Sequence, residues 1–373
     1  MENIKKQSVA TLMIVSVLLA ACSTSPQTRS VPAPEITPTA AIAATGPGPD
    51  LSVIKIYLQK YGKDYLQAGA TTLKTNADQY YVAVKAANFD YKKAWGDGKT
   101  LGPLLMNMRE AFNVAHTGYE SVEGIVAGVP SLSEFDTILD AGAPGKEGGD
   151  NIADFSVILP NGAILDKPGN LFHFLLEPMI FGTQATSMKL QDVDIDGDGK
   201  IGFGDNLPDA NLLKGVADSL NENVGKTNAA INAWQPSLTD AFTAMVVMTP
   251  TMDEYFNNWK ESRYISGEGS ALSRFVAHSR LIDVAGILDS IRTIYGAVKP
   301  SIEAKDPSAA KQIDTNYANL FKFVQDLVNK EKAGTRFTPD QAELLGKNAQ
   351  DQAQTITGQV TQAAGLLQIK LQN

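Results

Sequence analysis

The chain has 373 residues, a formal net charge of −9 and one cysteine. An acidic chain of this kind argues against nucleic acid as a partner, because phosphate binding requires clustered Lys and Arg. With a single cysteine the chain forms no internal disulfide, and its length suits one large domain or two smaller ones.

The N-terminal segment has the organisation of a bacterial export signal. Lys5 and Lys6 precede an apolar run over residues 9–21, which is shorter than the roughly 20 residues that span a bilayer and matches the core of a signal peptide. Two alanines then lead directly into Cys22, and this end of the run resembles the lipobox of bacterial lipoproteins. We therefore expect residues 1–21 to be a signal peptide and Cys22 to be the acylated first residue of the mature protein. A secretory signal followed by a chance cysteine is the alternative.

Lipidation would determine where the protein resides. Each buried CH₂ contributes about 0.8 kcal/mol, so a multiply acylated cysteine holds a protein on a membrane surface. Residues 22–49 are rich in Pro, Ala, Thr and Ser, which predicts a disordered tether between the lipid and a domain over residues 50–373. The expected location is extracytoplasmic, with the protein anchored to the cell membrane or the outer membrane.

The pattern of residues 50–373 is that of a mainly all-α protein. Apolar positions three and four apart predict helices over residues 50–85 and 103–127, and a last helix is expected from Pro339 to near Leu371. Capping signals mark several other helix starts. These signals are Asp50, Ser131 with Glu134, Thr251 with Glu254, Thr338 with Gln341, and the prolines Pro307 and Pro339. The expected architecture is a set of helical bundles, and a duplication of the bundle stays open.

A short segment interrupts the helical pattern. Residues 155–166 contain two apolar runs separated by Asn161-Gly162, and Asn-Gly is a turn dipeptide that tolerates positive φ. We expect a small β-hairpin here, within a Gly- and Pro-rich insertion over residues 142–169 that decorates the bundle.

Residues 194–205 fit the twelve-residue calcium loop of EF-hand proteins in register. Alternating aspartates supply oxygen ligands, a glycine provides the sharp turn, and later positions contribute a backbone carbonyl and a water-mediated contact. The predicted ligands in chain order are Asp194, Asp196, Asp198, Lys200 through its carbonyl, Gly202 through water, and Asp205, with Gly199 at the turn. Asp205 replaces the usual bidentate glutamate, which predicts weaker Ca²⁺ binding. The alternative is an acidic, Gly-rich surface turn without a metal.

A second candidate site lies on the second predicted helix. His116, Glu120 and Glu123 are spaced four and three residues apart, which places one imidazole and two carboxylates on one helical stripe. Such a set can bind a transition metal, iron included. Arg109 and Asn113 extend the same stripe, so the solvated side of an amphipathic helix is the alternative.

Residues 118–123, Gly-Tyr-Glu-Ser-Val-Glu, resemble the Gly-x-His-x-x-Glu motif of imelysin-like proteins, a family that includes the periplasmic component of Efe-type bacterial iron uptake. The resemblance implies an all-helical fold of two related bundles, with a metal bound by the motif between helices. Glu123 matches the motif glutamate, whereas Glu120 stands in the histidine position. A carboxylate pair favours harder cations, namely ferric iron, calcium or magnesium rather than zinc, and His116 one turn earlier is a substitute ligand.

The other histidines are predicted to have structural roles. His173 lies between two phenylalanines, which is typical of a core histidine, and His278 is expected in the core or on a helix surface, with Asp283 off its face. The core is also expected to contain Trp95, Trp234 and Trp259.

The sequence contains no hydrolase, phosphate-loop or dinucleotide motif. It therefore favours capture over catalysis: a cell-envelope lipoprotein that binds metal ions, in iron acquisition, beside a structural Ca²⁺. The captured ion would pass to a membrane transport partner. Two alternatives stay open, an envelope polysaccharide-binding lipoprotein without a transition metal and a metal-dependent peptidase.

Overall fold

The computed structural model describes residues 48–149, 151–182, 189–267, 270 and 272–372. The predicted signal peptide, Cys22 and the tether up to residue 47 lie outside the described residues. Among the helices that are described, none combines the length and the apolar character needed to cross a bilayer.

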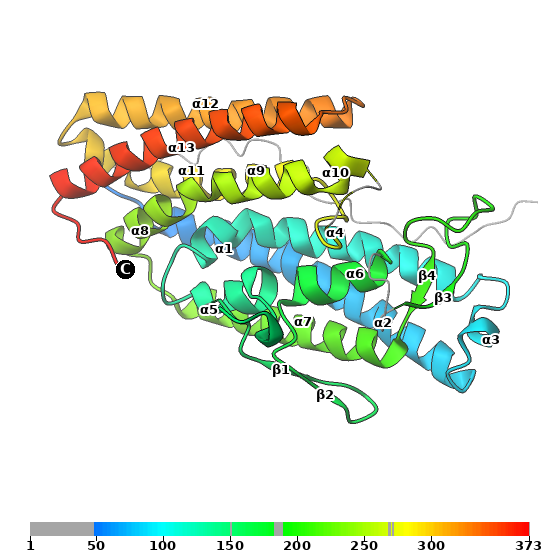
Figure 1. Cartoon of the computed structure of the whole chain (residues 1–373). Coiled ribbons are helices and arrows are strands. Elements are labelled where there is room, and N and C mark those ends of the chain that lie inside the picture. The colour runs from blue at the N-terminus through cyan, green and yellow to red at the C-terminus, as the bar shows by residue number, and fades with distance from the viewer. Residues whose placement is uncertain (1–47, 150, 183–188, 268–269, 271, 373) are drawn as a thin grey trace, which may run out of the picture. The chain divides into compact units, whose positions relative to one another are not determined.

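The described chain is mainly helical, which confirms the predicted all-α class (Figure 1). The long helices are α2 (Ala68–Ala86), α4 (Leu101–Val126), α7 (Ala210–Ala233), α11 (Arg280–Glu303), α12 (Pro307–Lys332) and α13 (Pro339–Leu366). The shorter helices are α1 (Ser52–Tyr61), α3 (Tyr91–Trp95), α5 (Ser133–Asp136), α6 (Glu177–Ile180), α8 (Leu238–Met248), α9 (Met252–Glu261) and α10 (Arg263–Ser266). Three π-helical turns, η1 (Gly62–Gln67), η2 (Thr137–Ala141) and η4 (Leu171–Leu176), and two 3₁₀ turns, η3 (Gly145–Glu147) and η5 (Thr249–Thr251), complete the set.

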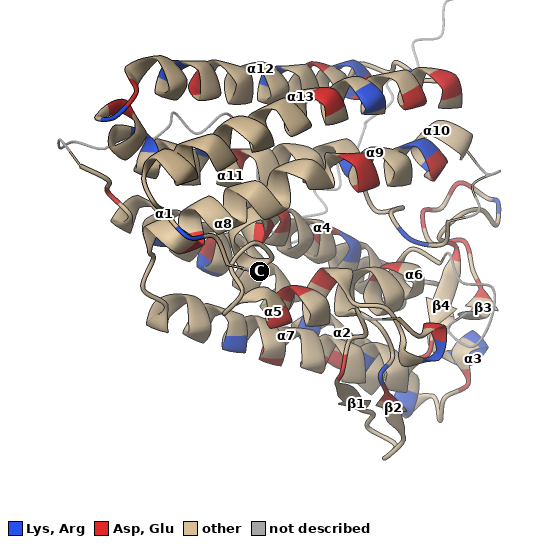
Figure 2. Ribbon diagram, turned by 60° about the vertical axis from the view of Figure 1, so that its left-hand side comes forward, with Lys and Arg blue, Asp and Glu red and all other residues tan. Residues whose placement is uncertain are grey.

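Two groups of helices meet along α4 and α11, which pack directly against each other (Figure 1). On one side α2 packs on α4, α7 packs on α2, and α1 joins the same group. On the other side α12 packs on α11, and α13 packs on both α12 and α9. Figure 2 shows acidic positions on α4 and α5 as well as on the outer helices. Charged residues of α4 and α11, among them Glu120 and Asp283, are buried in the structure.

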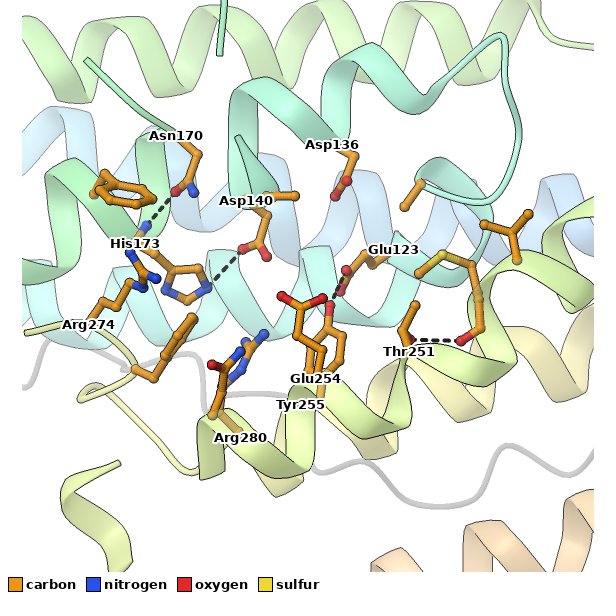
Figure 3. Close-up of a pocket in the computed structure, with 17 residues that line it drawn as sticks. Glu123, Asp136, Asp140, Asn170, His173, Thr251, Glu254, Tyr255, Arg274 and Arg280 are labelled. Atoms are coloured by element: carbon orange, nitrogen blue, oxygen red, sulfur yellow. Dashed lines mark hydrogen bonds and ion pairs between the residues drawn. The ribbon is translucent and has the colours of Figure 1, made fainter. Parts of the chain in front are cut away.

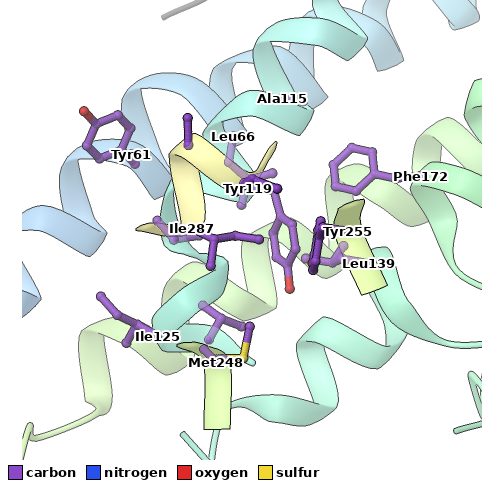
Figure 4. Close-up of a cluster of buried hydrophobic side chains, with 14 of the residues drawn as sticks. Tyr61, Leu66, Ala115, Tyr119, Ile125, Leu139, Phe172, Met248, Tyr255 and Ile287 are labelled. Atoms are coloured by element: carbon purple, nitrogen blue, oxygen red, sulfur yellow. The ribbon is translucent and has the colours of Figure 1, made fainter. Parts of the chain in front are cut away.

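Apolar side chains from both groups form one continuous core. Tyr119 of α4 and Ile287 of α11 are fully buried in it, and Figure 4 shows both side chains within the cluster. Trp259 is also fully buried, whereas Trp95 and Trp234 are partly buried and pack against the core. Of the three tryptophans predicted to lie in the core, Trp259 is fully buried, while Trp95 and Trp234 lie at the edge of the core.

Two glycines of α4 allow neighbouring helices to approach its backbone. A Cβ atom at Gly118 would lie 2.6 Å from the backbone nitrogen of Leu66, and one at Gly124 would lie 3.1 Å from the carbonyl oxygen of Ile287. Close-packed interiors have no room for such an atom without a shift of the backbone. The glycine that begins the recognised motif therefore serves the packing of η1 on α4.

The helix starts follow the capping rules only in part. Thr338 caps α13 within the predicted capping box. The other two predicted boxes are wrong. Instead of starting after Ser131, α5 begins at Ser133 without a side-chain cap. Thr251 does occupy the N-cap position of α9, but its hydroxyl donates to the Met248 carbonyl and accepts no capping hydrogen bond from the helix.

The first and last helices differ from their predicted bounds. The helix predicted over residues 50–85 begins at Ser52, and Asp50 Oδ1 accepts a hydrogen bond from the Ser52 N–H. The π-helical turn η1 then separates α1 from α2. The last helix ends at Leu366 rather than near Leu371.

Two small antiparallel sheets decorate the helices. β1 (Ser156–Ile158) pairs with β2 (Ile164–Asp166), which confirms the predicted hairpin. β3 (Lys189–Asp192) pairs with β4 (Asn206–Pro208), which the sequence pattern did not predict. This second ribbon brings together the two ends of the candidate calcium loop.

Candidate metal centre

All three histidines of the chain meet in one cluster. His116 lies on α4, His173 on η4, and His278 in the segment before α11. The His116 ring lies between the other two: its Nδ1 atom is 3.1 Å from His278 Nε2, and its Nε2 atom is 3.2 Å from His173 Nε2. His173 is buried as predicted, but its ring faces polar groups rather than only apolar ones.

Two carboxylates join the histidines on one side of the His116 ring. Glu120 Oε1 lies 3.0 Å and Asp140 Oδ1 lies 3.1 Å from His116 Nε2. Asp140 Oδ1 is also 3.1 Å from His173 Nε2. Ligands at about 2.1 Å from a metal lie about 3.0 Å apart in an octahedron and about 3.4 Å apart in a tetrahedron. The distances from His116 Nε2 to the other three atoms, and from Asp140 Oδ1 to His173 Nε2, therefore match the spacing of ligands around one small metal ion.

Three different elements supply these side chains. His116 and Glu120 are one helical turn apart on α4, so they project from the same face. Asp140 lies on η2 and His173 on η4, and both turns are π-helical, a conformation that is frequent at functional sites. The Asn170 side chain accepts a hydrogen bond from the backbone N–H of His173 at 2.7 Å and fixes the start of η4.

Glu177 holds the far side of the His173 ring. Its Oε2 atom is 2.9 Å from His173 Nδ1, one helical turn away. The Glu177 carboxylate also accepts hydrogen bonds of 2.8 Å from three consecutive backbone N–H groups, those of Phe275, Val276 and Ala277. A carboxylate with this many donors accepts the Nδ1 proton, so His173 presents Nε2 to the cluster.

The charges within the cluster shift several pKa values. Burial alone would lower the pKa of His173, but the charge and hydrogen bond of Asp140, followed by those of Glu177, raise it to about 9. Burial alone would raise the pKa of Asp140, but His173 and His116 hold it well below its ordinary value. Burial likewise opposes ionisation of Glu177, yet the hydrogen bond and charge of His173 lower its pKa to about 2. Protons on imidazole therefore compensate the buried carboxylates when no metal is bound.

Two glutamates of α4 carry oxygens that lack a donor. Burial, followed by the charges of Asp283 and Asp140, raises the pKa of Glu120 well above its ordinary value. Burial and the neighbouring Glu120 do the same for Glu123. Among the described residues, neither Glu120 Oε2 nor Glu123 Oε2 receives a hydrogen bond from a donor group. Buried oxygens in this state are costly, and a bound cation would satisfy them.

On the other side of the His116 ring, Asp283 and Arg280 contact the cluster and each other. Asp283 Oδ1 is 2.5 Å from His278 Nε2, and its Oδ2 atom accepts a 2.7 Å hydrogen bond from Arg280 Nη1. Arg280 Nη1 also lies 3.4 Å from Glu120 Oε1. The prediction that Asp283 lies off the face of His278 is wrong, because His278 precedes the N-cap of α11 and its ring turns back toward that helix.

A pocket of about 300 Å³ opens beside the cluster (Figure 3). His173, Asp140 and Arg280 line one part of it, and Glu123 lines another. The Tyr255 hydroxyl donates to Glu123, as Figure 3 shows. The pocket volume has room for a hydrated ion next to Asp140 and His173, whereas His116 and Glu120 lie behind them and do not line the pocket.

The sequence-predicted ligands are only partly brought together. His116 and Glu120 converge, while Glu123 points to Tyr255 and the pocket and is outside the four-ligand set. The alternative of a solvated stripe is wrong: His116 and Glu120 are 1% and 0% exposed. Arg109, on the same stripe, donates to backbone carbonyls of neighbouring segments instead of facing free solvent.

The candidate calcium loop has a partly assembled set of oxygens. Asp194, Asp196 and Asp205 place carboxylate oxygens within 4.8 Å of one another. Asp198 is not in this group, and its Oδ1 atom accepts a hydrogen bond from the Lys200 N–H. The Asp205 side chain accepts hydrogen bonds from two backbone N–H groups of the loop, which fixes its orientation.

Sequence reasoning missed most of the cluster. Asp140 and His278 lie on a π-helical turn and in an irregular segment, where no periodicity indicates which way a side chain points. A usable signal was present at His173 and Glu177, which are four residues apart and therefore face the same way on a helical turn. The phenylalanines on either side of His173 favoured the interpretation of a core histidine instead.

A comparison with known protein families identifies the family of the chain. The family profile described as Peptidase_M75: Imelysin matches residues 57–363. A search of the curated proteins found no significant match. The matched range spans α2 to α12 entirely and includes every residue of the cluster. The chain therefore belongs to the imelysin family.

Proposed function

We propose that the protein captures a transition-metal ion at the buried cluster, on the outer side of the cell membrane. The observation that carries this proposal is the position of three potential ligand atoms, Glu120 Oε1, Asp140 Oδ1 and His173 Nε2, at 3.0–3.2 Å from His116 Nε2. Transition metals bound to proteins are held by sets of imidazole nitrogens and carboxylate oxygens of this kind. Imelysin-family proteins are extracytoplasmic, which supports the location.

The donor set indicates which ions the site prefers. Two imidazoles with two carboxylates suit iron, zinc and copper, whereas calcium and magnesium take oxygen ligands alone. The expectation of a hard cation rested on Glu120 and Glu123 as a pair, and Glu123 is outside the four-ligand set. Iron in either oxidation state fits the set, so iron acquisition remains the function that we propose for the site.

Burial supports capture rather than catalysis on a large substrate. His116, Glu120, Asp140 and His173 are each no more than 5% exposed. The pocket gives an ion access to Asp140 and His173, which line it, whereas a polypeptide backbone would have to displace packed helices to reach the cluster. Within this proposal, acylated Cys22 anchors the protein to a membrane, and a membrane transport partner receives the ion.

The test is direct measurement of bound metal in variants of the cluster. We expect the purified protein, stripped with a chelator and reloaded with iron or zinc, to retain the ion and to melt at a higher temperature. A ligand at about 100 times its Kd adds about 2.7 kcal/mol to stability. His116→Ala with His173→Ala should abolish both effects. Glu110→Gln is the matched control for Glu120→Gln, because Glu110 is an exposed carboxylate on the same helix.

Retention of the metal by the His116→Ala, His173→Ala double variant would overturn the proposal. Unchanged binding in Glu120→Gln with normal binding in Glu110→Gln would remove Glu120 from the ligand set. A melting shift without bound metal in elemental analysis would point to a different ligand.

We also propose that residues 194–205 bind a structural Ca²⁺. The convergence of Asp194, Asp196 and Asp205 supports it, as does the positive φ of 80° at Gly199, where the loop pattern requires a glycine. Arg109 of α4 donates to the Gly204 carbonyl at 2.5 Å. A loop ordered by Ca²⁺ would therefore also stabilise its contact with α4. Ca²⁺ should raise the melting temperature of the wild type and leave an Asp194→Asn, Asp196→Asn variant unchanged. Equal shifts in both proteins would refute the site.

A further inference from the structure

The His116 ring has a second nitrogen, and it too faces potential ligands. His116 Nδ1 lies 3.1 Å from His278 Nε2 and 3.9 Å from Asp283 Oδ1. These three atoms all lie within 4.8 Å of one another, on the opposite side of the ring from Asp140 and His173. Both nitrogens of one buried imidazole therefore face a group of metal-ligating atoms.

Buried carboxylates lie on both sides of the His116 ring. Glu120 and Asp140 lie near its Nε2 atom, and Asp283 lies on the side of its Nδ1 atom. Arg280 is the one arginine in contact with these carboxylates among the described residues. Carboxylates are costly to bury without cationic partners, and a divalent cation on each side of the ring would supply them.

We propose that a second divalent cation binds on this opposite side, held by His116 Nδ1, His278 Nε2 and Asp283 Oδ1. This inference rests on the proposed function, because the first ion occupies His116 Nε2. His116 then bridges the two ions as an imidazolate, and the proton that its ring loses passes to water. Two imidazole nitrogens and one carboxylate oxygen suit zinc or copper, and water completes the coordination.

The surrounding contacts leave these ligand atoms available. Arg280 Nη1 binds Oδ2 of Asp283, which fixes the carboxylate and keeps Oδ1 directed at the histidines. His278 is the most exposed of the three ligands, with 12% of its side chain accessible, so solvent and ions reach it. The 2.5 Å contact between His278 Nε2 and Asp283 Oδ1 would open to about 3.0–3.4 Å around an ion.

Copper provides a readout that distinguishes a bridging ligand from an orienting one. We would titrate the purified protein with Cu²⁺ and measure bound copper by elemental analysis and native mass spectrometry. All samples would carry Asp194→Asn and Asp196→Asn so that the acidic loop contributes no copper. No histidine lies outside the cluster, which limits adventitious binding. Electron paramagnetic resonance then reports whether the bound ions are magnetically coupled.

The expected result is two Cu²⁺ per chain, with the integrated resonance signal per copper falling as the second ion binds. His278→Ala and His278→Asn should each bind one Cu²⁺ with a full, uncoupled signal. Asn can still hydrogen-bond to His116, so a residue that only orients the ring would be replaced by it. Asp283→Asn should also reduce the stoichiometry to one.

The outcomes separate this inference from the proposed function. One Cu²⁺ in the parent protein, unchanged by His278→Ala, would overturn the second ion and leave the first intact. Two Cu²⁺ that persist in His278→Ala would place the second ion elsewhere and overturn the inference. No bound copper in the parent protein, with zinc and iron also excluded, would overturn both.

Discussion

At the scale of single residues, Glu177 decides how His173 is presented to the cluster. Its carboxylate receives the His173 ring and three backbone N–H groups from residues 275–277, so it links two separate segments. Carboxylates that hold the outer nitrogen of a metal-binding histidine fix its tautomer and raise its basicity. Within the proposed metal site, Glu177 is thus a positioning residue rather than a ligand.

Glu177→Gln should weaken metal binding by about 10–100-fold, because the amide no longer fixes the Nδ1 proton of His173. Competition with a chromophoric chelator measures this change. Glu343→Gln serves as the control, since Glu343 is an exposed carboxylate paired with Lys260 on the surface. Equal affinity in Glu177→Gln and Glu343→Gln would show that Glu177 has no positioning role.

At the scale of elements, the π-helical turns explain why the site could be read only partly from the sequence. The α4 stripe obeys the period of an α-helix, so His116 and Glu120 were found by spacing. A π-helical turn accommodates an extra residue and changes the direction of the side chains that follow. Asp140 lies on such a turn, and no period of 3.6 predicts its direction.

The packing of η1 on α4 can be tested at Gly118. Gly118→Ala should destabilise the protein by about 1–3 kcal/mol, because the new Cβ would meet Leu66 and Tyr65 at 2.6–2.7 Å. Gly358→Ala is the matched control: this glycine lies within α13 with open space around it. There the substitution should stabilise by about 0.5–1 kcal/mol through helix propensity. Urea denaturation measures both, and a stabilised Gly118→Ala would refute the close approach.

At the scale of the whole molecule, the sequence predicted the class of fold but not the assembly of the centre. Helical periodicity and caps such as Thr338 predicted long helices, and the hairpin followed from its turn residues. The cluster instead needs α4 and α11 in contact and loops from distant parts of the chain, including His278. Long-range packing of this kind leaves no local pattern.

The protonated state of the centre predicts how stability depends on pH. The folded-state pKa of His173, about 9, exceeds its ordinary value of 6.5. Its proton therefore stabilises the metal-free fold fully below pH 6.5, by up to about 3 kcal/mol, and this is lost as pH rises through 9. Burial and Asp140 raise the pKa of Asp136 from 3.8 to about 7. Ionisation of Asp136 as pH rises through 7 therefore also lowers the stability of the fold.

Metal-free protein should therefore melt at a lower temperature at pH 9 than at pH 6, as differential scanning calorimetry can measure. Metal-loaded protein should lose less stability or gain it, because the ion replaces these protons and binds more tightly as they leave. A metal-free melting temperature that rises between pH 6 and pH 9 would contradict the assigned protonation.

The most direct test of the metal centre is anomalous X-ray scattering from crystals loaded with iron or zinc, recorded at the absorption edge of the metal. The account predicts an anomalous peak between His116 Nε2, His173 Nε2, Asp140 Oδ1 and Glu120 Oε1. Fully loaded crystals with no peak among these atoms, or with the metal bound only elsewhere, would contradict it.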